Sequence, residues 1–460
     1  MKTKRFICAA LLFVAMVFAE SASAQLKTSY FMEGSYFRTD LNPALVPTRG
    51  YIALPVISGF AAGQYSNYNS YENMYYKVDG SYVGAMNESV PANEFLSKLP
   101  NKCVDSIVGD ISLLKLGFYT LNGTFFDFGA TMRISYNSVM PKDYFKMMKG
   151  AYDSSINIEN MSADLNQYLE TYAGTAIRLG DNLTIGARFK FLIGLNNCAL
   201  TVNKLSVNND TYTIHGNLKM NSVMYDSSQY DGSLDSITVL GDSFSATKGN
   251  IHSFGGAIDL GAEMRLLDSK LKLSAAITDL GLIKWSGKTQ LESGVINYDA
   301  TGNSDLLNII SDAEVNMPDK FSGYTTRLTT NVNLGAEYNF LGNHFAVGAL
   351  SHTRFYRNAI ATEFTASFNV RPTNWMTFTA SHTFFNGNTP GIYGAAVNIH
   401  PRAINIFFGM DYISNSKNTT DFEPTTMSEI DSMLSPKATS YNFYIGVGFN
   451  FGRPDFLVEQ

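Results

Sequence analysis

Beyond its first residues the chain lacks a long apolar run. No stretch after residue 24 approaches the roughly 18 consecutive apolar residues of a membrane-spanning helix. This excludes membrane helices from the mature chain, so strands must do the crossing if the chain spans a membrane. Only an outer membrane suits a protein that crosses with strands.

An excess of positive charge is also missing. The chain carries 34 Lys and Arg against 40 Asp and Glu, a formal net charge of −6, and no basic stripe is visible. Phosphate binding needs such a stripe, so nucleic acid is not an expected partner.

Recognisable catalytic and metal-binding patterns are missing too. The six histidines have no metal-ligand spacing, and none completes a Ser or Cys nucleophile pattern. We therefore expect no cofactor and no enzyme activity, with a barrel enzyme acting on lipid or protein kept as a third functional alternative. Cysteine is scarce: after residue 24 only Cys103 and Cys198 remain, in or beside predicted outer loops. A disulfide between them and two free thiols both stay open, because spacing alone does not show proximity.

What is present begins with an export signal. Lys2, Lys4 and Arg5 precede the apolar run 6–19, and the small residues 22–24 fit a cleavage site. We expect residues 1–24 to be removed as a signal peptide, so that the mature chain begins at Gln25. Three basic residues and one acidic residue leave with it, which changes the formal charge from −6 to −8.

Alternation of apolar and polar residues dominates the rest of the chain. From Leu183 to Leu195 every second residue is apolar, and the residues between them include Arg188 and Lys190. A strand that is apolar on one face and charged on the other fits a barrel in lipid. The 32 Phe, 26 Tyr and 37 Gly suit aromatic girdles and close-packed strands, although a soluble β-sandwich or propeller would share this composition.

The order of the connections favours the barrel over those alternatives. Asn122-Gly123 readily supplies the positive φ angles of a tight hairpin, and five more compact reversals separate alternating runs: 180–182, 268–270, 342–343, 371–374 and 400–402. The connections between hairpins are mostly long and polar: 137–166, 196–252, 281–326 and 414–439, with shorter ones at 354–358 and 385–390. Short turns at one rim and long loops at the other are typical of outer-membrane barrels.

The predicted fold class is therefore all-β, a transmembrane antiparallel β-barrel of about 14 strands with short periplasmic turns and long extracellular loops. The first strand is expected at Tyr51–Phe60 and the last at Tyr441–Phe451. Residues 25–50 form a periplasmic or plug segment, 51–452 the barrel and 453–460 a C-terminal tail. Two segments, Asn93–Val108 and Met161–Tyr172, have some helical character and are predicted to cap the mouth.

The two faces of the strands separate apolar from ionisable residues. The more apolar parity, taken as lipid-facing, contains Phe126, Phe128, Met132, Ile134, Ile258, Leu260, Met264, Val332, Leu334, Tyr338, Phe364, Phe368, Ile404, Ile406, Phe408 and Met410. The other parity collects equal numbers of acidic and basic residues as candidates for the lumen: Asp127, Arg133, Glu170, Arg178, Arg188, Lys190, Asp259, Glu263, Arg265, Lys272, Glu337, Glu363, Arg371 and Asp411. Ionisable groups are costly on a lipid face, so this clustering supports the barrel. Balanced charges favour a paired, obstructed lumen, and solvated residues in an open water channel are the alternative.

Several passages resemble outer-membrane proteins of one superfamily. Asn42-Pro43-Ala44, Ala276–Trp285 and the stretch from Met317-Pro318 into Leu328–Phe340 are similar to segments of the long-chain fatty acid transporter (FadL)/PorV-like superfamily. Gly186–Leu195 is similar to a strand of a large uncharacterised domain family in it, which the chain resembles most. The resemblance implies a fourteen-strand barrel whose N-terminal segment plugs the lumen. By this resemblance Gln25–Arg49 is a candidate plug, with Asn42, Pro43 and Ala44 at its junction with the wall.

Two functions remain in view at this point. One is a plugged outer-membrane channel or transporter for small molecules, hydrophobic ones included. The other is a non-transporting barrel that serves as partner or scaffold of a secretion or surface-assembly complex. Outer-membrane lipid is an expected partner in both, together with a small hydrophobic ligand in the first and a secretion-complex protein in the second.

Overall fold

The computed structural model describes residues 27–54, 58–69, 71–208, 211–222, 252–286, 290–292, 296–301, 323–385, 392–414 and 440–452. The predicted signal peptide and C-terminal tail lie outside these residues. Within the described part of the chain the helices are short: η2 Thr28–Phe31, η3 Tyr36–Asp40, α2 Tyr71–Met74, α3 Ala92–Lys98 and α4 Lys142–Met148. None of these described helices is long and apolar enough to cross a membrane.

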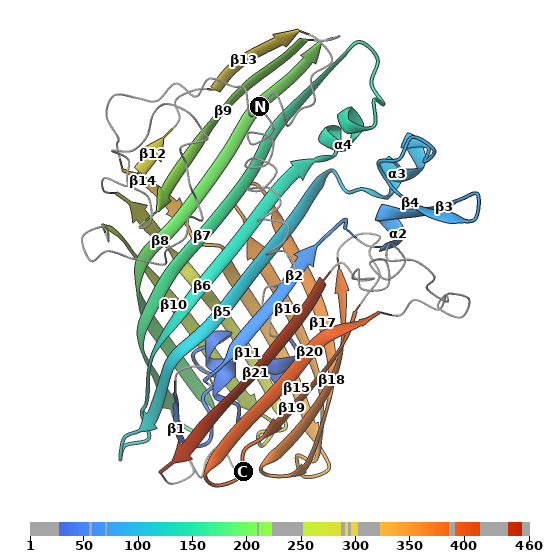
Figure 1. Ribbon diagram of the computed structural model, residues 1–460. Helices are drawn as coiled ribbons and strands as arrows, with labels where there is room; N and C mark the ends of the chain where they lie inside the picture. Colours follow the sequence, from blue (N-terminus) through green and yellow to red (C-terminus); the bar gives the residue numbers. More distant parts are fainter. Residues whose placement is uncertain are drawn as a thin grey trace.

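Long antiparallel strands run obliquely along the molecule and close on themselves as a barrel (Figure 1). In the described residues the wall has fourteen strand positions, one of them shared by β1 and β2, which both pair with β5 and β21. The wall strands are β1 Gly50–Ala53, β2 Phe60–Ser66, β5 Lys102–Tyr119, β6 Phe125–Pro141, β7 Ser155–Leu179, β8 Leu183–Asn208, β10 Ser253–Leu266, β11 Leu271–Trp285, β15 Thr330–Phe340, β16 Phe345–Phe355, β17 Ile360–Thr373, β18 Met376–Phe385, β19 Ile392–Ile399, β20 Ile404–Ser414 and β21 Ser440–Phe451. The predicted all-β barrel is thus confirmed, and the sandwich and propeller alternatives are wrong.

All six predicted hairpin turns join consecutive wall strands at one end of the barrel (Figure 1). Gly123 in the β5–β6 turn has a φ of 77° and Gly180 in the β7–β8 turn a φ of 64°, values that a residue without a Cβ adopts freely. The turn chemistry therefore set the register of these strand pairs as expected.

Several predicted loops are partly strand. Residues 137–166 contain the end of β6 and the first half of β7, and residues 196–252 contain the upper part of β8 and β9 Thr211–Ser222. β7 and β8 have 25 and 26 residues, well above the roughly 9–11 that span a bilayer. Their outer halves lie beyond the apolar belt, and register shifts at Gln167–Tyr168 and Val202–Lys204 break the alternation into short pieces there.

Further short strands continue the wall at the long-loop end. β12 Gln290–Glu292 and β13 Ile296–Thr301 pair with β9, and β14 Tyr324–Arg327 pairs with β11 ahead of β15. β3 Tyr75–Val78 and β4 Ser81–Gly84 form a separate hairpin that packs with α3 and α4 around Phe95 and Phe145.

Two other sequence predictions need correction. Met161–Tyr172 is not helical but lies within β7, because pairing with β6 and β8 satisfies its backbone on both sides. In Asn93–Val108 only the first half is helical, as α3, and β5 begins at Lys102. The first strand is not continuous over Tyr51–Phe60: Ala53 pairs with Lys115 and Phe60 with Ile111, while Leu54, Ser58 and Gly59 between them belong to neither strand.

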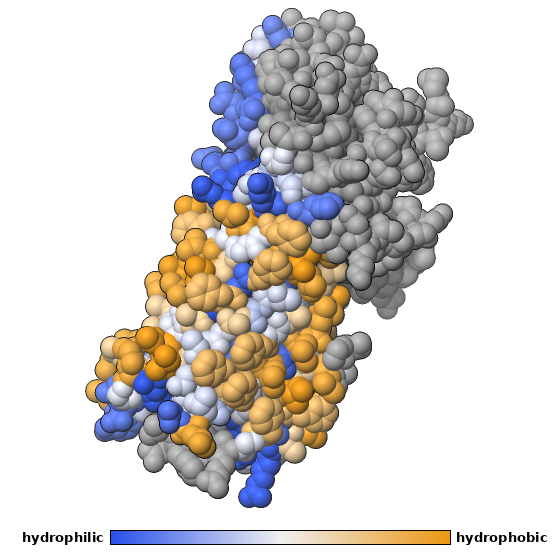
Figure 2. Space-filling model, turned by 90° about the vertical axis from the view of Figure 1, so that its left-hand side faces the viewer, coloured by the Kyte–Doolittle hydropathy of each residue, from blue (hydrophilic) through white to orange (hydrophobic). Residues whose placement is uncertain are grey.

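An apolar belt surrounds the short-turn half of the barrel on the face seen in Figure 2, with hydrophilic residues beyond it. The residues predicted to face lipid contribute to it, among them Leu260, Phe364 and Leu334, which are each about half exposed. Such side chains would be costly to expose to water together, so the belt marks the part of the wall that lies in a bilayer.

Candidate functional site in the barrel lumen

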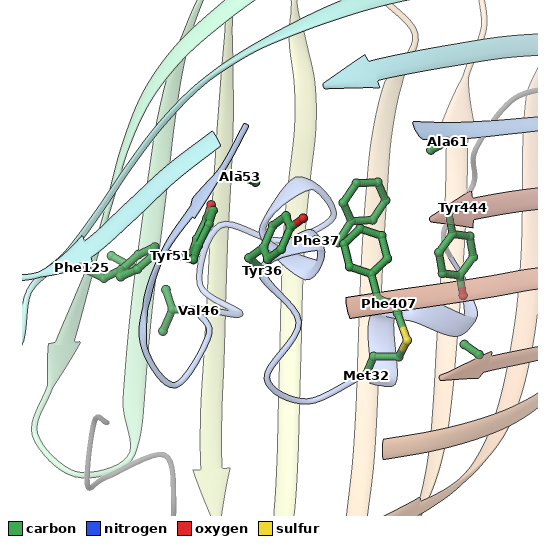
Figure 3. Packing of buried hydrophobic residues seen from close by; sticks show 12 residues of the cluster. Met32, Tyr36, Phe37, Val46, Tyr51, Ala53, Ala61, Phe125, Phe407 and Tyr444 are labelled. Carbon is green, nitrogen blue, oxygen red and sulfur yellow. The ribbon is translucent and has the colours of Figure 1, made fainter. Parts of the chain in front are cut away.

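The N-terminal residues Lys27–Arg49, here called the inner segment, lie inside the barrel rather than outside its rim (Figures 1 and 3). Two short 3-10 helices, η2 and η3, shape the segment, and the Ser35 hydroxyl starts η3 by accepting a hydrogen bond from the backbone N–H of Phe37 at 3.3 Å. Nearly all of its side chains are buried. The segment therefore fills the lumen at the level of the apolar belt.

Aromatic rings seal this level of the lumen (Figure 3). Tyr36 stacks on Tyr51 of β1 with ring centroids 4.5 Å apart, and its edge meets Phe407 of β20 at 5.3 Å. Phe37 packs on the same Phe407 ring at 4.6 Å and faces Tyr444 of β21. Packing of this kind excludes water, so the cluster leaves no aqueous path between these rings.

Asn42-Pro43-Ala44 rests on the wall at β8, β10 and β11. The Asn42 amide donates to the carbonyls of Ala262 and Ala275 at 3.3 Å each, and its oxygen accepts from the Ala44 N–H at 2.9 Å. A Cβ at Gly186 would overlap the Pro43 backbone, and one at Gly261 would overlap the Asn42 side chain. These two wall glycines are needed for the close approach of the segment.

Charged side chains hold the middle of the inner segment. Asp40 accepts a hydrogen bond from the Arg188 guanidinium at 3.1 Å and forms a second ion pair with Lys115 of β5. Arg188 is fully buried, pairs with Asp127 as well and lies 4.0 Å above the Tyr172 ring. Burial by itself raises the pKa of Asp40, but the charges of Lys115 and Arg188 outweigh that effect and hold the pKa at about 2.

A second group of charges lies nearer the short turns. The carboxylate of Glu33 is 2.5 Å from Lys272 of β11 and 3.3 Å from Arg371 of β17. Arg371 also binds Glu337 of β15 at 2.9 Å. The Glu33 carboxylate thus links two wall strands directly and reaches β15 through Arg371 and Glu337.

The start of the inner segment is bound to the opposite wall. The Lys27 ammonium lies 2.5 Å from Glu363 of β17, which also pairs with Arg354 of β16. The Thr28 hydroxyl lies 2.6 Å from that of Ser381 and donates a hydrogen bond to Asp411. The segment is therefore attached to strands on both sides of the lumen.

The fourteen charged residues predicted for the lumen all lie on the inner face and are buried or half-buried. Further ion pairs join them across strands: Lys190 lies 2.8 Å from Asp259 and Arg133 lies 3.0 Å from Glu170. Arg265 pairs with Glu263 on the same strand at 2.7 Å, and Arg178 is half-buried on β7.

Alternation alone missed some of the most connected groups. Asp279 pairs with Lys190 at 2.6 Å and Arg133 at 3.3 Å, yet its φ of 59° and a register shift at Ile258–Leu260 take it out of simple parity. Glu33 and Asp40 belong to an irregular segment with no periodicity to interpret. The bulge between Ser112 and Leu114 likewise breaks the alternation that would assign Lys115 to the inner face. A single lysine in an otherwise apolar strand is nevertheless a sign of an inward-facing residue.

Of the two alternatives left open for the cysteines, the structure has two free thiols. Both cysteines are free thiols and lie on strands, Cys103 opposite Met140 of β6 and Cys198 opposite Leu165 of β7. Two strands separate β5 from β8, which at about 4.8 Å per strand puts the cysteines roughly 14 Å apart along the wall. A disulfide requires Cα atoms within about 7 Å, so these two residues do not meet that requirement.

A cavity of about 790 Å³, here called the chamber, lies between the inner segment and the long-loop end. Lys27, Asp40 and Leu41 form its floor, and β5, β6, β7, β11 and β14–β16 form its sides. Polar residues outnumber apolar ones in the lining, whose apolar members include Leu41, Leu328 and Leu350. No group of three or more His, Cys, Asp or Glu side chains in the described ranges is arranged to hold a metal ion.

The turn from β16 to β17, Tyr356–Ala359, crosses the mouth of the chamber. Its Arg357 reaches Asp164 of β7 at 3.4 Å and the Thr201 hydroxyl of β8 at 3.1 Å. The Asn358 carbonyl accepts from the Lys102 ammonium of β5 at 2.6 Å. Since β16 and β5 lie on opposite sides of the barrel, this crossing turn partly roofs the chamber.

Comparisons with known proteins give relatives by family and by structure. Residues 43–411 match the model of a family of unknown function. Similar solved structures include a Pseudomonas aeruginosa FadL homologue, with 10% identity, a TM-score of 0.43 and coverage of 94% of this chain and 99% of that one. The P. putida toluene transporter TodX is 10% identical, with a TM-score of 0.40 and coverage of 90% and 93%. The search of curated proteins finds no match.

Proposed function

We propose that this chain, which belongs to the family of unknown function DUF5723, is an outer-membrane channel or transporter for small molecules that the inner segment closes as a plug. The short turns then face the periplasm and the long loops the cell exterior, as is usual for such barrels. A solute enters the chamber from outside and passes inward when the plug shifts.

The attachment of the inner segment is the observation that carries this proposal. Besides the apolar packing of Tyr36 and Phe37, this segment is held by several ion pairs and by hydrogen bonds of Asn42 and Thr28, more polar attachments than packing alone requires. Buried ion pairs add little net stability over apolar packing. Separating them is costly while both partners stay buried, but water that enters an opening lumen would solvate both charges, which suits a plug that leaves its seat and returns.

Planar-bilayer conductance tests the proposal. Deleting residues 27–49 removes Tyr36 and Phe37 from the aromatic seal, so the variant is expected to conduct while the full chain stays closed or opens rarely. The matched control is the full chain carrying Thr353→Cys and Thr362→Cys, which crosslinks two wall strands and leaves the seal in place. A correctly folded deletion variant that stays as closed as the full chain contradicts a plug-gated path.

The outer part of β7–β9 favours a second candidate, a partner or scaffold barrel. These strands extend the wall well beyond the apolar belt, and α4 packs there on an apolar cluster that includes Ile158 and Leu205 (Figure 1). Crosslinking in native outer membranes followed by mass spectrometry distinguishes the roles. A reproducible protein partner bound at β7–β9 favours the scaffold, and a solitary barrel favours the channel.

A further inference from the structure

The chamber limits the chemistry of what the barrel carries. We propose that it binds a neutral, hydroxyl-rich solute of the short-oligosaccharide class. The inference rests on the proposed function, because the chamber lies on the proposed path, and it narrows the cargo. The volume of about 790 Å³ lies within the roughly 300–1,000 Å³ typical of small-molecule sites.

Apart from Arg327, each charged residue that lines the chamber forms an ion pair within the described part of the chain. Arg133 binds Glu170 at 3.0 Å and Asp279 at 3.3 Å, and Arg357 binds Asp164 at 3.4 Å. A charged solute would have to compete for one member of such a pair and leave the other buried without its partner, which is costly. A neutral solute leaves every pair intact.

The remaining lining offers hydrogen-bond donors and acceptors together. Amides of Asn331 and Asn333 and hydroxyls of Ser106 and Ser135 lie among guanidinium donors and carboxylate acceptors. A solute hydroxyl donates one hydrogen bond and accepts others, so it can bind to either a donor or an acceptor of the lining. A hydrocarbon would displace water from these groups without replacing its hydrogen bonds.

His352 of β16 identifies a specific contact point. Its ring is 5% exposed and its Nδ1 lies 2.5 Å from the Asn333 side-chain oxygen, which leaves Nε2 without a hydrogen-bond partner among the described residues. Nη1 of Arg354, two residues along the same inner face, has no hydrogen-bond partner in that part of the chain either. Buried polar groups are rarely left unsatisfied, and hydroxyls of a bound solute would satisfy both.

Equilibrium dialysis of the purified full chain against radiolabelled maltotriose tests the proposal, with sucrose and raffinose as competitors and decanoate as the apolar probe. Saturable maltotriose binding is expected, and His352→Leu is expected to weaken it about tenfold, as for the loss of one buried hydrogen bond. His382→Leu is the matched control, because His382 lies on β18 and its ring packs against Phe384 and Tyr393 on the outer face of the barrel. Asn331→Leu serves as the second variant if His352→Leu does not fold.

Three results overturn the proposal: no saturable binding of any of the three sugars, unchanged affinity in the folded lining variant, or decanoate bound in preference to sugar. The last result would place the ligand on the apolar part of the lining, at Leu41, Leu328 and Leu350, instead. Binding is measured with the inner segment seated and without flux. A failed sugar test therefore leaves the plug proposal intact. If the deletion variant stays closed, the plug proposal fails, but the measured sugar binding still stands.

Discussion

The guanidinium of Arg188, on wall strand β8, donates a hydrogen bond over 3.1 Å to the carboxylate of Asp40 in the inner segment. Arg188 is fully buried and holds Asp127 at the same time, so one wall residue connects the segment to two strands. The attachment of the segment thus depends on a small number of charged groups that can be changed singly.

Asp40→Asn is expected to loosen the inner segment. The substitution leaves Lys115 buried without a carboxylate and removes one partner of Arg188, a type of change that costs about 3–5 kcal/mol in buried pairs. Opening events in planar bilayers should become more frequent. Asp181→Asn in the exposed β7–β8 turn is the control, and equal opening frequencies in the two variants would contradict the role of Asp40.

A disulfide at the start of the segment is expected to keep the barrel closed. Thr28→Cys with Ser381→Cys, in a chain with Cys103 and Cys198 replaced by serine, puts two sulfurs where hydroxyl oxygens lie 2.6 Å apart. When this pair is combined with Asp40→Asn, oxidation should suppress the openings expected of that substitution, and reduction should restore them. The Thr353→Cys and Thr362→Cys pair, whose hydroxyls are 3.0 Å apart within the wall, should leave the openings unchanged. Openings that persist in the oxidised segment-to-wall variant would show that this end does not move.

Gly186→Ala is expected to displace the segment at Asn42-Pro43. Its Cβ would overlap the Pro43 backbone, and overpacking of this kind costs about 1–3 kcal/mol. Limited proteolysis should cut the inner segment faster, while the barrel keeps its gel mobility without heating. Gly109→Ala on β5 meets nothing within 4 Å and should behave like the unaltered chain. Equal cleavage rates in both variants would argue against a tight seat at Gly186.

Arg357→Ala is expected to open the roof of the chamber. Its contacts with Asp164 and Thr201 hold the crossing turn over the mouth. With Ser135→Cys as a reporter in the chamber of a cysteine-free chain, a membrane-impermeant thiol reagent should label severalfold faster. Arg402→Ala at the opposite, short-turn end is the control. An unchanged labelling rate would mean that the reagent does not reach the chamber past Arg357, which would contradict its role in the roof.

Predictions from the sequence succeeded where a local pattern reports a local structure. Asn122-Gly123 and the other short reversals indicated the six hairpins because turn geometry depends on a few adjacent residues. Arg188 and Lys190 were assigned to the inner face because side chains alternate along any strand. The same logic failed at Asp279 and Lys115, where bulges or a positive φ interrupt the alternation.

The amino-acid sequence by itself determined the six hairpin turns, the alternating parts of the wall strands and which face of those parts meets lipid, since all three follow from neighbours in the chain. Only the tertiary structure decided that Asp40 lies between Lys115 and Arg188, that Cys103 and Cys198 are apart, and that Arg357 spans the mouth. Those relationships join residues from strands on different sides of the lumen. They depend on how the closed wall arranges its strands around the inner segment. The periodicity of apolar residues along the chain contains no information on that arrangement.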